Sequence, residues 1–218
     1  LEFRRVLFRS ENVNINYQGH MSDNMQKIDL IGFPINDKGL TGCLSFINLK
    51  VKEVIINASN STCEDTVNFI NASGSLKNII IKNSMSDALD IDFSNLKIEN
   101  ININFAGNDC VDFSYGNYQI KNLYALNCGD KALSVGEKSK LNIDQINALN
   151  SEIGIASKDS SVVNLNKAKF DSLEICLEAY KKKQEFEGGI INYIDMECVS
   201  KKLTLSQDKY SLISQRNL

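Results

Sequence analysis

The feature that most constrains this chain is a repeat of 22 residues that begins near Asp65. Successive blocks start DTVNFINASG, DALDIDFSNL, DCVDFSYGNY, KALSVGEKSK and IGIASKDSSV. One apolar column runs through the blocks at constant spacing and consists of Val67, Leu89, Val111, Leu133, Ile155 and Leu177. A fixed period of this length is typical of solenoids, in which each repeat is one structural unit stacked on its neighbours.

Within each block, apolar residues lie two apart in short runs that are separated by Asn, Ser, Gly and Asp. This spacing favours strands joined by turns over helices, whose apolar spacing would be three or four. Three more columns support the register: Leu76, Ile98, Ile120, Ile143 and Leu165; Ile79, Ile101, Leu123, Ile146 and Ala168; Ile81, Ile103, Ala125, Ala148 and Phe170. The last two blocks keep these columns only if one residue is inserted near Lys138. The chain is therefore predicted to be all-β, a right-handed parallel β-helix with 22-residue coils.

The polar residues repeat as well. Asn78, Asn100 and Asn122 fall at intervals of 22 residues. Asparagines stacked on successive strands can bond amide to amide, and asparagine also tolerates left-handed turns. We interpret this column as structural.

The ends of the chain differ from the repeat. Residues 1–10, LEFRRVLFRS, hold three of the four arginines and look like a translated sequencing adapter, so we exclude them from the fold as an artefact. We expect irregular, truncated N-terminal coils over residues 11–42, the parallel β-helix over 43–200, and a C-terminal strand or tail over 201–218. A truncated start predicts an additional N-terminal domain in the complete protein.

Charge and hydropathy exclude some partners. The net charge is −3 and no basic patch is evident, which argues against nucleic acid as a partner. No run of 18 apolar residues predicts a membrane span.

The six cysteines, at positions 43, 63, 110, 128, 176 and 198, lack CxxC spacing. A zinc site is therefore not expected. Cys110 and Cys176 share a repeat position with Ala88, which is the pattern of a small core residue. A Cys176–Cys198 bridge between neighbouring coils is an alternative.

Acidic residues collect on a few successive coils. In ALDIDFSN the alternation predicts that Leu89, Ile91 and Phe93 point inward and that Asp90 and Asp92 point outward. One coil later Asp112 falls over Asp90. A second column consists of Asp65, Asp87, Asp109 and Lys131, and Asp130 lies beside it.

Carboxylates one rung apart repel each other unless a proton, a lysine or a cation lies between them. One hypothesis is a calcium site formed by Asp87, Asp90, Asp109 and Asp112, because hard oxygen ligands on a rigid sheet suit this ion. The alternative is structural: Lys131 and solvent balance the charges, or the aspartates cap turn amides. Asp92, Asp130 and Tyr115 are the predicted contacts to a substrate, since an exposed aromatic face can stack on a sugar ring.

The phrases SDALDIDFSN, GNDCVDFSYGN, GDKALSVGEKS, IGIASKDSS and AYKKKQEF carry a family resemblance. Over roughly residues 40 to 200 the chain resembles right-handed parallel β-helix repeats of the pectin-lyase-like superfamily, and β-helix regions that accompany spore-coat-kinase-like domains in bacterial proteins. In polysaccharide lyases of this fold, calcium neutralises a uronate while a basic residue removes the C5 proton; that role would fall to Lys131. No arginine lies between Ser10 and Arg216, and the only histidine is His20, so the usual arginine or histidine of such enzymes has no counterpart in the repeat.

Two functions follow as expectations. The first is a non-catalytic β-helix module of a bacterial secreted or cell-surface protein, which acts as a scaffold or a polysaccharide-binding face. The second is a calcium-assisted lyase or epimerase that acts on a uronate-containing polysaccharide and uses Lys131.

Overall fold

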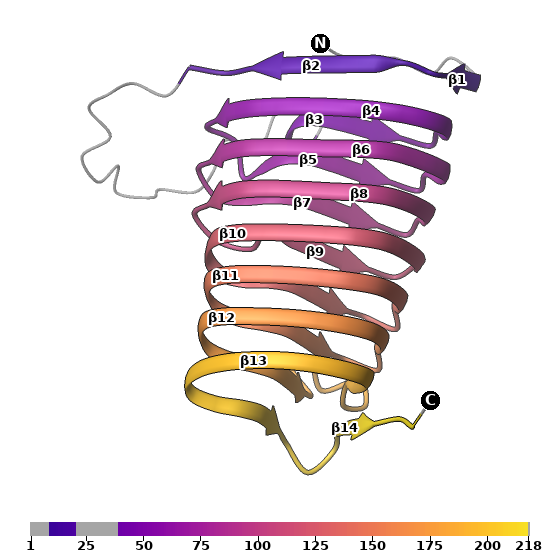
Figure 1. Cartoon of the computed structure of the whole chain (residues 1–218). Coiled ribbons are helices and arrows are strands. Elements are labelled where there is room, and N and C mark those ends of the chain that lie inside the picture. The colour runs from indigo at the N-terminus through magenta and orange to yellow at the C-terminus, as the bar shows by residue number, and fades with distance from the viewer. Residues whose placement is uncertain (1–8, 21–38, 218) are drawn as a thin grey trace.

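The computed structural model describes residues 9–20 and 39–217, and within them every regular element is a strand. The strands are β1 Arg9–Glu11, β2 Asn14–Gln18, β3 Gly42–Ile47, β4 Lys50–Ser61, β5 Asp65–Ile70, β6 Ser73–Ser84, β7 Asp87–Asp92, β8 Asn95–Ala106, β9 Val111–Ser114, β10 Asn117–Gly136, β11 Lys140–Lys158, β12 Val162–Tyr180, β13 Ile190–Gln207 and β14 Leu212–Gln215. The recorded strand pairs are all parallel, and the coils stack along one axis with a right-handed winding (Figure 1). The predicted parallel β-helix is confirmed.

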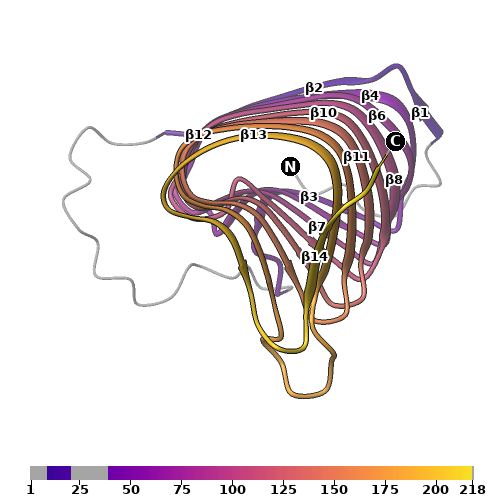
Figure 2. The same cartoon turned by 60° about the horizontal axis from the view of Figure 1, so that its bottom comes forward.

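Each coil combines a short strand and a long, bent strand. The short strands β3, β5, β7 and β9 pair in that order and continue into the C-terminal part of β10. We call this stack, with the matching parts of β11 and β12, the first sheet. The long strands stack beside it, and Figure 2 shows that successive coils follow nearly the same path around the axis of the stack. Coils are offset by 22 residues, as in the pairing of Leu89 with Val111.

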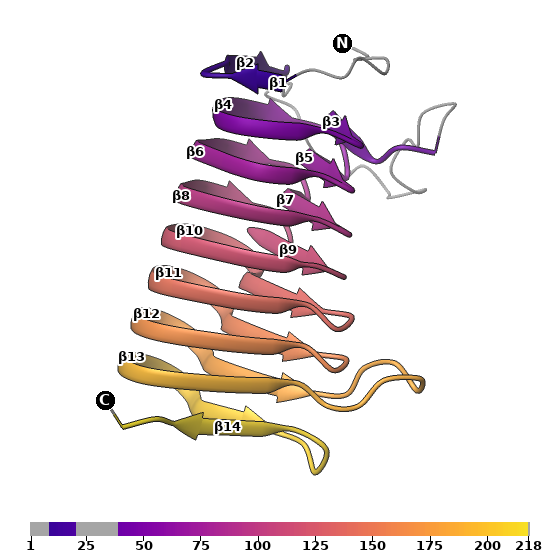
Figure 3. The same ribbon diagram turned by 90° about the vertical axis from the view of Figure 1, so that its right-hand side faces the viewer.

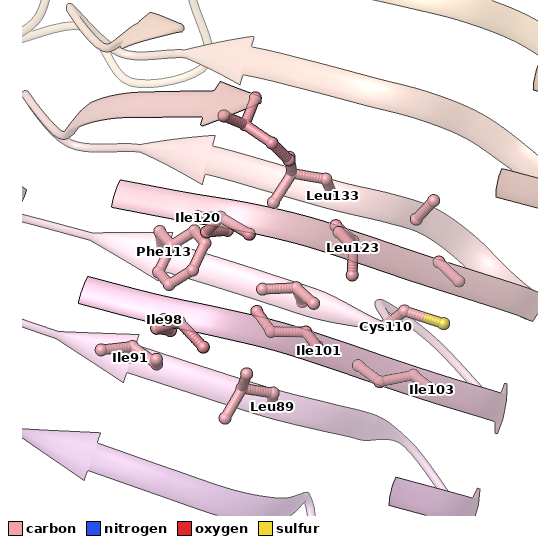
Figure 4. Close-up of a cluster of buried hydrophobic side chains, with 14 of the residues drawn as sticks. Leu89, Ile91, Ile98, Ile101, Ile103, Cys110, Phe113, Ile120, Leu123 and Leu133 are labelled. Carbon is pink, nitrogen blue, oxygen red and sulfur yellow. The ribbon is translucent and has the colours of Figure 1, made fainter. Parts of the chain in front are cut away.

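The interior is filled by the four apolar columns that the repeat predicts. Every member of these columns is at most 3% exposed. In Figure 4 Leu89, Ile91 and Phe113 point from the first sheet toward Ile101, Ile120 and Leu123 on the long strands. At about 25 cal/mol per Å² of apolar surface, burial of this continuous core is the main stabilising contribution. No coil can bury its inner face alone, so the stacking is cooperative.

The turn after each short strand contains a residue in the left-handed region. Asn48 and Asn71 have this conformation in the first two coils, and Phe93 and Tyr115 follow at the same position. The prediction that Phe93 points inward is therefore wrong: β7 ends at Asp92, and the reversed turn leaves the Phe93 ring 54% exposed. One coil further on, the expected insertion near Lys138 adds a second left-handed residue, so Glu137 and Lys138 both have positive φ.

The asparagine column on the long strands forms the predicted ladder. Asn100 Nδ2 donates to Asn78 Oδ1 at 2.9 Å, and Asn122 Nδ2 donates to Asn100 Oδ1 at 3.0 Å. Asn100 therefore both donates and accepts, so amides stacked in this way satisfy one another along the axis.

All six cysteines form disulfides, namely Cys43–Cys63, Cys110–Cys128 and Cys176–Cys198. The bonded cysteines are 20, 18 and 22 residues apart, so each bond closes a loop of about one coil. The core position predicted for Cys110 and Cys176 is confirmed, since both are fully buried. The Cys176–Cys198 alternative is confirmed as well.

The two ends of the stack are covered unequally. β1 and β2 pair with β4 at one end, and at the other end β14 pairs with only the first part of β13 (Figure 3). Leu205 pairs with the core residue Leu177 but remains 41% exposed. A loop follows Tyr180 and joins β12 to β13. Residues 21–38 of the predicted irregular N-terminal region lie outside the described residues.

Since the described residues form no helix, they contain none that is long and apolar enough to cross a membrane.

Candidate functional site

The outward side of the first sheet carries the predicted acids in two columns. Asn68 pairs with Asp90, Asp90 with Asp112, and Asp112 with Ser134. Beside this column, Asp92 pairs with Ser114 on the next rung. The predicted stacking of Asp112 over Asp90 is confirmed. We call this surface the acidic face.

Asp87 and Asp109 form the edge of the acidic face and bond to the backbone. Asp87 Oδ1 accepts the N–H of Asp109 at 2.9 Å and the side-chain amide of Asn108 at 2.7 Å. Asp109 Oδ1 accepts the N–H of Lys131 at 3.0 Å. Burial raises the pKa of Asp87 to about 6 and that of Asp109 to about 7, although these hydrogen bonds and Lys131 oppose the shift. The capping role that was the structural alternative is present at both residues.

Asp90 and Asp92 lie in the centre of the acidic face and are partly exposed. Asp90 Oδ2 accepts Asn68 Nδ2 at 2.7 Å, and among the described residues no lysine or arginine nitrogen lies within 4 Å of either carboxylate. Burial, followed by repulsion from neighbouring carboxylates, raises the pKa of Asp92 to about 6 and that of Asp90 well above its usual value. These two carboxylates are therefore the uncompensated acids of the face.

Asp112 belongs to a buried polar group that the sequence reasoning missed. Lys158 Nζ lies 3.8 Å from Asp112 Oδ2 and donates to Ser134 Oγ at 2.8 Å, and Lys158 is only 5% exposed. Burial raises the pKa of Asp112, and Lys158 opposes that rise. The aliphatic part of Lys158 lies where a side chain at Gly136 would be, because a Cβ at that glycine would meet Lys158 Cε at 2.8 Å. A glycine at an outward strand position was the one sequence signal for this arrangement.

Lys131, the predicted base, is enclosed by acids. Its Nζ lies 3.5 Å from Asp109 Oδ1 and forms a close ion pair with Asp130, and its side chain is only 12% exposed. Burial lowers the pKa of Lys131, but the attraction of Asp109 and Asp130 outweighs it, so that the pKa is raised overall. A protonated amine can balance charge but cannot accept a proton, so this geometry favours charge balance for Lys131. Its catalytic role, like the substrate contact assigned to Asp130, stays a prediction.

An aromatic platform borders the acidic face at the end of β7 and β9. The rings of Phe93 and Tyr115 stack with centroids 4.8 Å apart and planes 7° apart, and they are 54% and 40% exposed. Phe186, from the loop after β12, meets Tyr115 edge-on at 6.2 Å. Tyr115 is therefore exposed, as its predicted contact with a sugar ring requires. Its role as a substrate contact stays a prediction.

The face does not offer a preformed metal site. Within residues 9–20 and 39–217, no three His, Cys, Asp or Glu side chains are grouped so that they could hold one ion. Asp87 and Asp109 bond to backbone amides, while Asp90 and Asp112 lie on successive rungs. The calcium site stays a prediction that would require these side chains to reorient.

Two hollows of the molecule lie apart from the acidic face. Hollows of about 470 and 650 Å³ lie over the long strands, the first beside Tyr124 and Leu149 and the second beside Lys97 and Lys140, and no residue of the acidic face lines either of them. A face built on parallel strands with an aromatic edge can contact an extended ligand along several rungs.

The sequence matches no protein-family model, and comparison with curated proteins and with solved structures found no significant similarity.

Proposed function

We propose that this chain is a non-catalytic, carbohydrate-binding β-helix module of a secreted or cell-surface protein. The observation that carries the proposal is the exposed Phe93–Tyr115 stack beside partly exposed carboxylates. Aromatic faces pack against the C–H faces of sugar rings, while carboxylates accept hydrogen bonds from sugar hydroxyls. The rigid sheet fixes both groups in register.

The backbone adds support for a ligand-binding role. Phe93 and Tyr115 have φ values of 50° and 46°, a conformation that bulky residues rarely adopt. Asn48 and Asn71 fill the same position in the preceding coils at lower conformational cost. Strain of this kind costs about 1–3 kcal/mol per residue and is concentrated at functional sites.

Three disulfides in a chain of this size support a secreted or surface location, because such bonds persist in oxidising compartments. The resemblance to pectin-lyase-like β-helices, and to those beside spore-coat-kinase-like domains, supports a bacterial module joined to further domains. The partner that we propose is a polysaccharide.

The test is binding of the protein to an immobilised panel of neutral, acidic and amino-sugar oligosaccharides. We expect at least one class to bind, and Phe93→Ala or Tyr115→Ala to weaken that binding about tenfold, as expected for the loss of one aromatic contact. Tyr124→Ala is the matched control, since Tyr124 is 45% exposed on another face. Absence of binding to every class, or equal loss in the control, would reject the proposal.

A second candidate is the calcium-assisted lyase or epimerase. It is favoured by the pKa of Asp109, which burial raises to about 7, because a carboxyl group that titrates near neutrality can exchange protons with a substrate. In this candidate Lys131 would need to lose its proton, against the pull of Asp109 and Asp130. Incubation with polyuronates and calcium, followed by assays for unsaturated or epimerised sugars, tests it directly.

A further inference from the structure

The acidic face has more hydrogen-bond acceptors than donors. On the rung before Asp90, Asn68 is 98% buried and its amide is directed at Asp90, yet Asn68 Oδ1 has no partner. On the rung after Asp90, the buried Oδ1 of Asp112 also has no partner. Unpaired buried acceptors cost free energy, so both rungs next to Asp90 lack a donor.

The distribution of charged side chains also indicates that a donor is lacking near Asp90. Lys131 is paired with Asp109 and Asp130, and Lys158 lies against Asp112. Among the described residues, no such cation lies beside Asp90 and Asp92. A cation bound between these two carboxylates, next to the aromatic platform that begins at Phe93, would offset their mutual repulsion and favour their ionised form.

Aromatic faces and carboxylates together suit an ammonium group. An ammonium ion supplies three donors and a positive charge, and it is attracted to the face of an aromatic ring. The platform already makes this contact within the chain, since Lys138 Nζ lies 5.6 Å from the centroid of Phe186, which packs against Tyr115. A uronate would instead bring a carboxylate toward uncompensated aspartates, and this would be repulsive.

We propose that the acidic face selects a polysaccharide whose sugars carry free amino groups, with the ammonium at Asp90 and Asp92 and the sugar ring against Phe93 and Tyr115. This proposal rests on the carbohydrate-binding function inferred above and names the ligand class. The two uncompensated carboxylates provide charge recognition. The stacked rings provide the apolar contact that any pyranose can use.

The experiment is calorimetric titration of the whole chain near pH 6.5 with three hexasaccharides: fully deacetylated β-1,4-glucosamine, its fully N-acetylated form, and oligogalacturonate with and without calcium. We expect the glucosamine hexamer to bind about tenfold more tightly than its N-acetylated form, a preference consistent with one cation–π contact together with charge pairing. Raising the salt concentration should reduce this preference.

Variants separate local recognition from general attraction to an acidic protein. Asp92→Asn should remove the preference and leave binding of the N-acetylated hexamer unchanged. Asp144→Asn is the matched control, because it removes one exposed carboxylate from the long-strand face. Equal loss of preference in both variants would reject a specific site.

The remaining outcomes are distinguishable. Equal binding of the amino and N-acetylated hexamers would overturn the amino-sugar inference and keep the carbohydrate-binding function. Binding of oligogalacturonate only, with calcium, would overturn the inference in favour of the second candidate. Failure of all three hexamers, together with no binding on the wider panel, would overturn both proposals.

Discussion

Two polar ladders run along the same solenoid, and they solve the same stacking problem differently. On the long strands, Asn78, Asn100 and Asn122 bond amide to amide, and the central Asn100 is both donor and acceptor. On the first sheet, Asp90 lies over Asp112, and an ionised carboxylate is only an acceptor. The asparagine ladder stabilises the fold by itself. The aspartate ladder leaves Asp112 Oδ1 unpaired, and burial raises the pKa of both acids.

This difference indicates what each ladder is for. If polar stacking were the only requirement on the first sheet, asparagine could occupy the positions of Asp90 and Asp112, which follow Asn68 in the same column. The long strands use asparagine in this way. The chain places acids on the first sheet instead, and it places exposed aromatic residues in the adjoining turn, where asparagine is the less strained choice. We infer that the fold tolerates the aspartate ladder because the ladder serves a ligand.

The largest expected effect comes from a change that weakens both ladders. The Cys110–Cys128 disulfide closes the coil that carries Asp112 and Asn122. Cys110→Ser/Cys128→Ser should lower the free energy of unfolding by about 3 kcal/mol, as expected for opening a loop of this length. Denaturant unfolding measures the loss. Six thiols titratable in the native, unreduced protein would contradict the disulfide assignment itself.

The next effect is a dependence of stability on pH that arises from the partly or fully buried acids on and beside the acidic face. Burial raises the folded-state pKa of Asp65, Asp87 and Asp92 to about 6 and that of Asp109 to about 7, above the ordinary value of 3.8. The folded protein therefore holds more protons than the unfolded chain between about pH 4 and 7, and its stability must fall as pH rises through that window.

Thermal unfolding at pH 4.5, 6 and 7.5 measures this dependence. We expect a total loss on the order of 1–3 kcal/mol, since partial exposure and the cations Lys131 and Lys158 moderate the repulsion. Stability that rises from pH 4.5 to 7.5 would show that the carboxylates are better compensated than their surroundings indicate.

A single substitution can introduce an acceptor-only residue, as in the aspartate ladder, into the asparagine ladder. Asn100→Asp keeps an acceptor for Asn122 but removes the donor to Asn78. We expect a loss of about 1–2 kcal/mol at pH 7, from one missing hydrogen bond and one added charge, and a smaller loss at pH 4. Asn104→Asp, at an exposed long-strand position outside the ladder, is the control that adds a charge. An unchanged stability for Asn100→Asp would mean that the amide bonds of the ladder contribute little.

Most of the fold could be predicted from the sequence because its determinants are periodic. The column from Val67 to Leu177 fixes the inward side of every coil, and the insertion near Lys138 shows where the period breaks. The error at Phe93 arose because strand alternation was extended one residue past the end of β7. Asn48 and Asn71 at the equivalent position were the available sign of a turn.

The candidate site was less predictable because its contacts depend on which neighbouring side chains are small. Lys158 reaches Asp112 only because Gly136 leaves space, and no local pattern around Lys158 shows this. The register placed Asp87 and Asp90 in their columns. It could not show that Asp87 bonds to the backbone while Asp90 does not, because that distinction depends on the turn geometry before each strand.

The most direct test of the central claim is the stability and ligand binding of Asp90→Asn at pH 7. Asparagine at this position can accept from Asn68 Nδ2 and donate to the unpaired Asp112 Oδ1, which would convert the aspartate ladder into an amide ladder. We predict that the free energy of unfolding rises by about 1 kcal/mol while binding of the glucosamine hexamer weakens. A variant that is less stable than the native protein and binds the hexamer equally well would show that Asp90 serves the fold, and it would contradict the account.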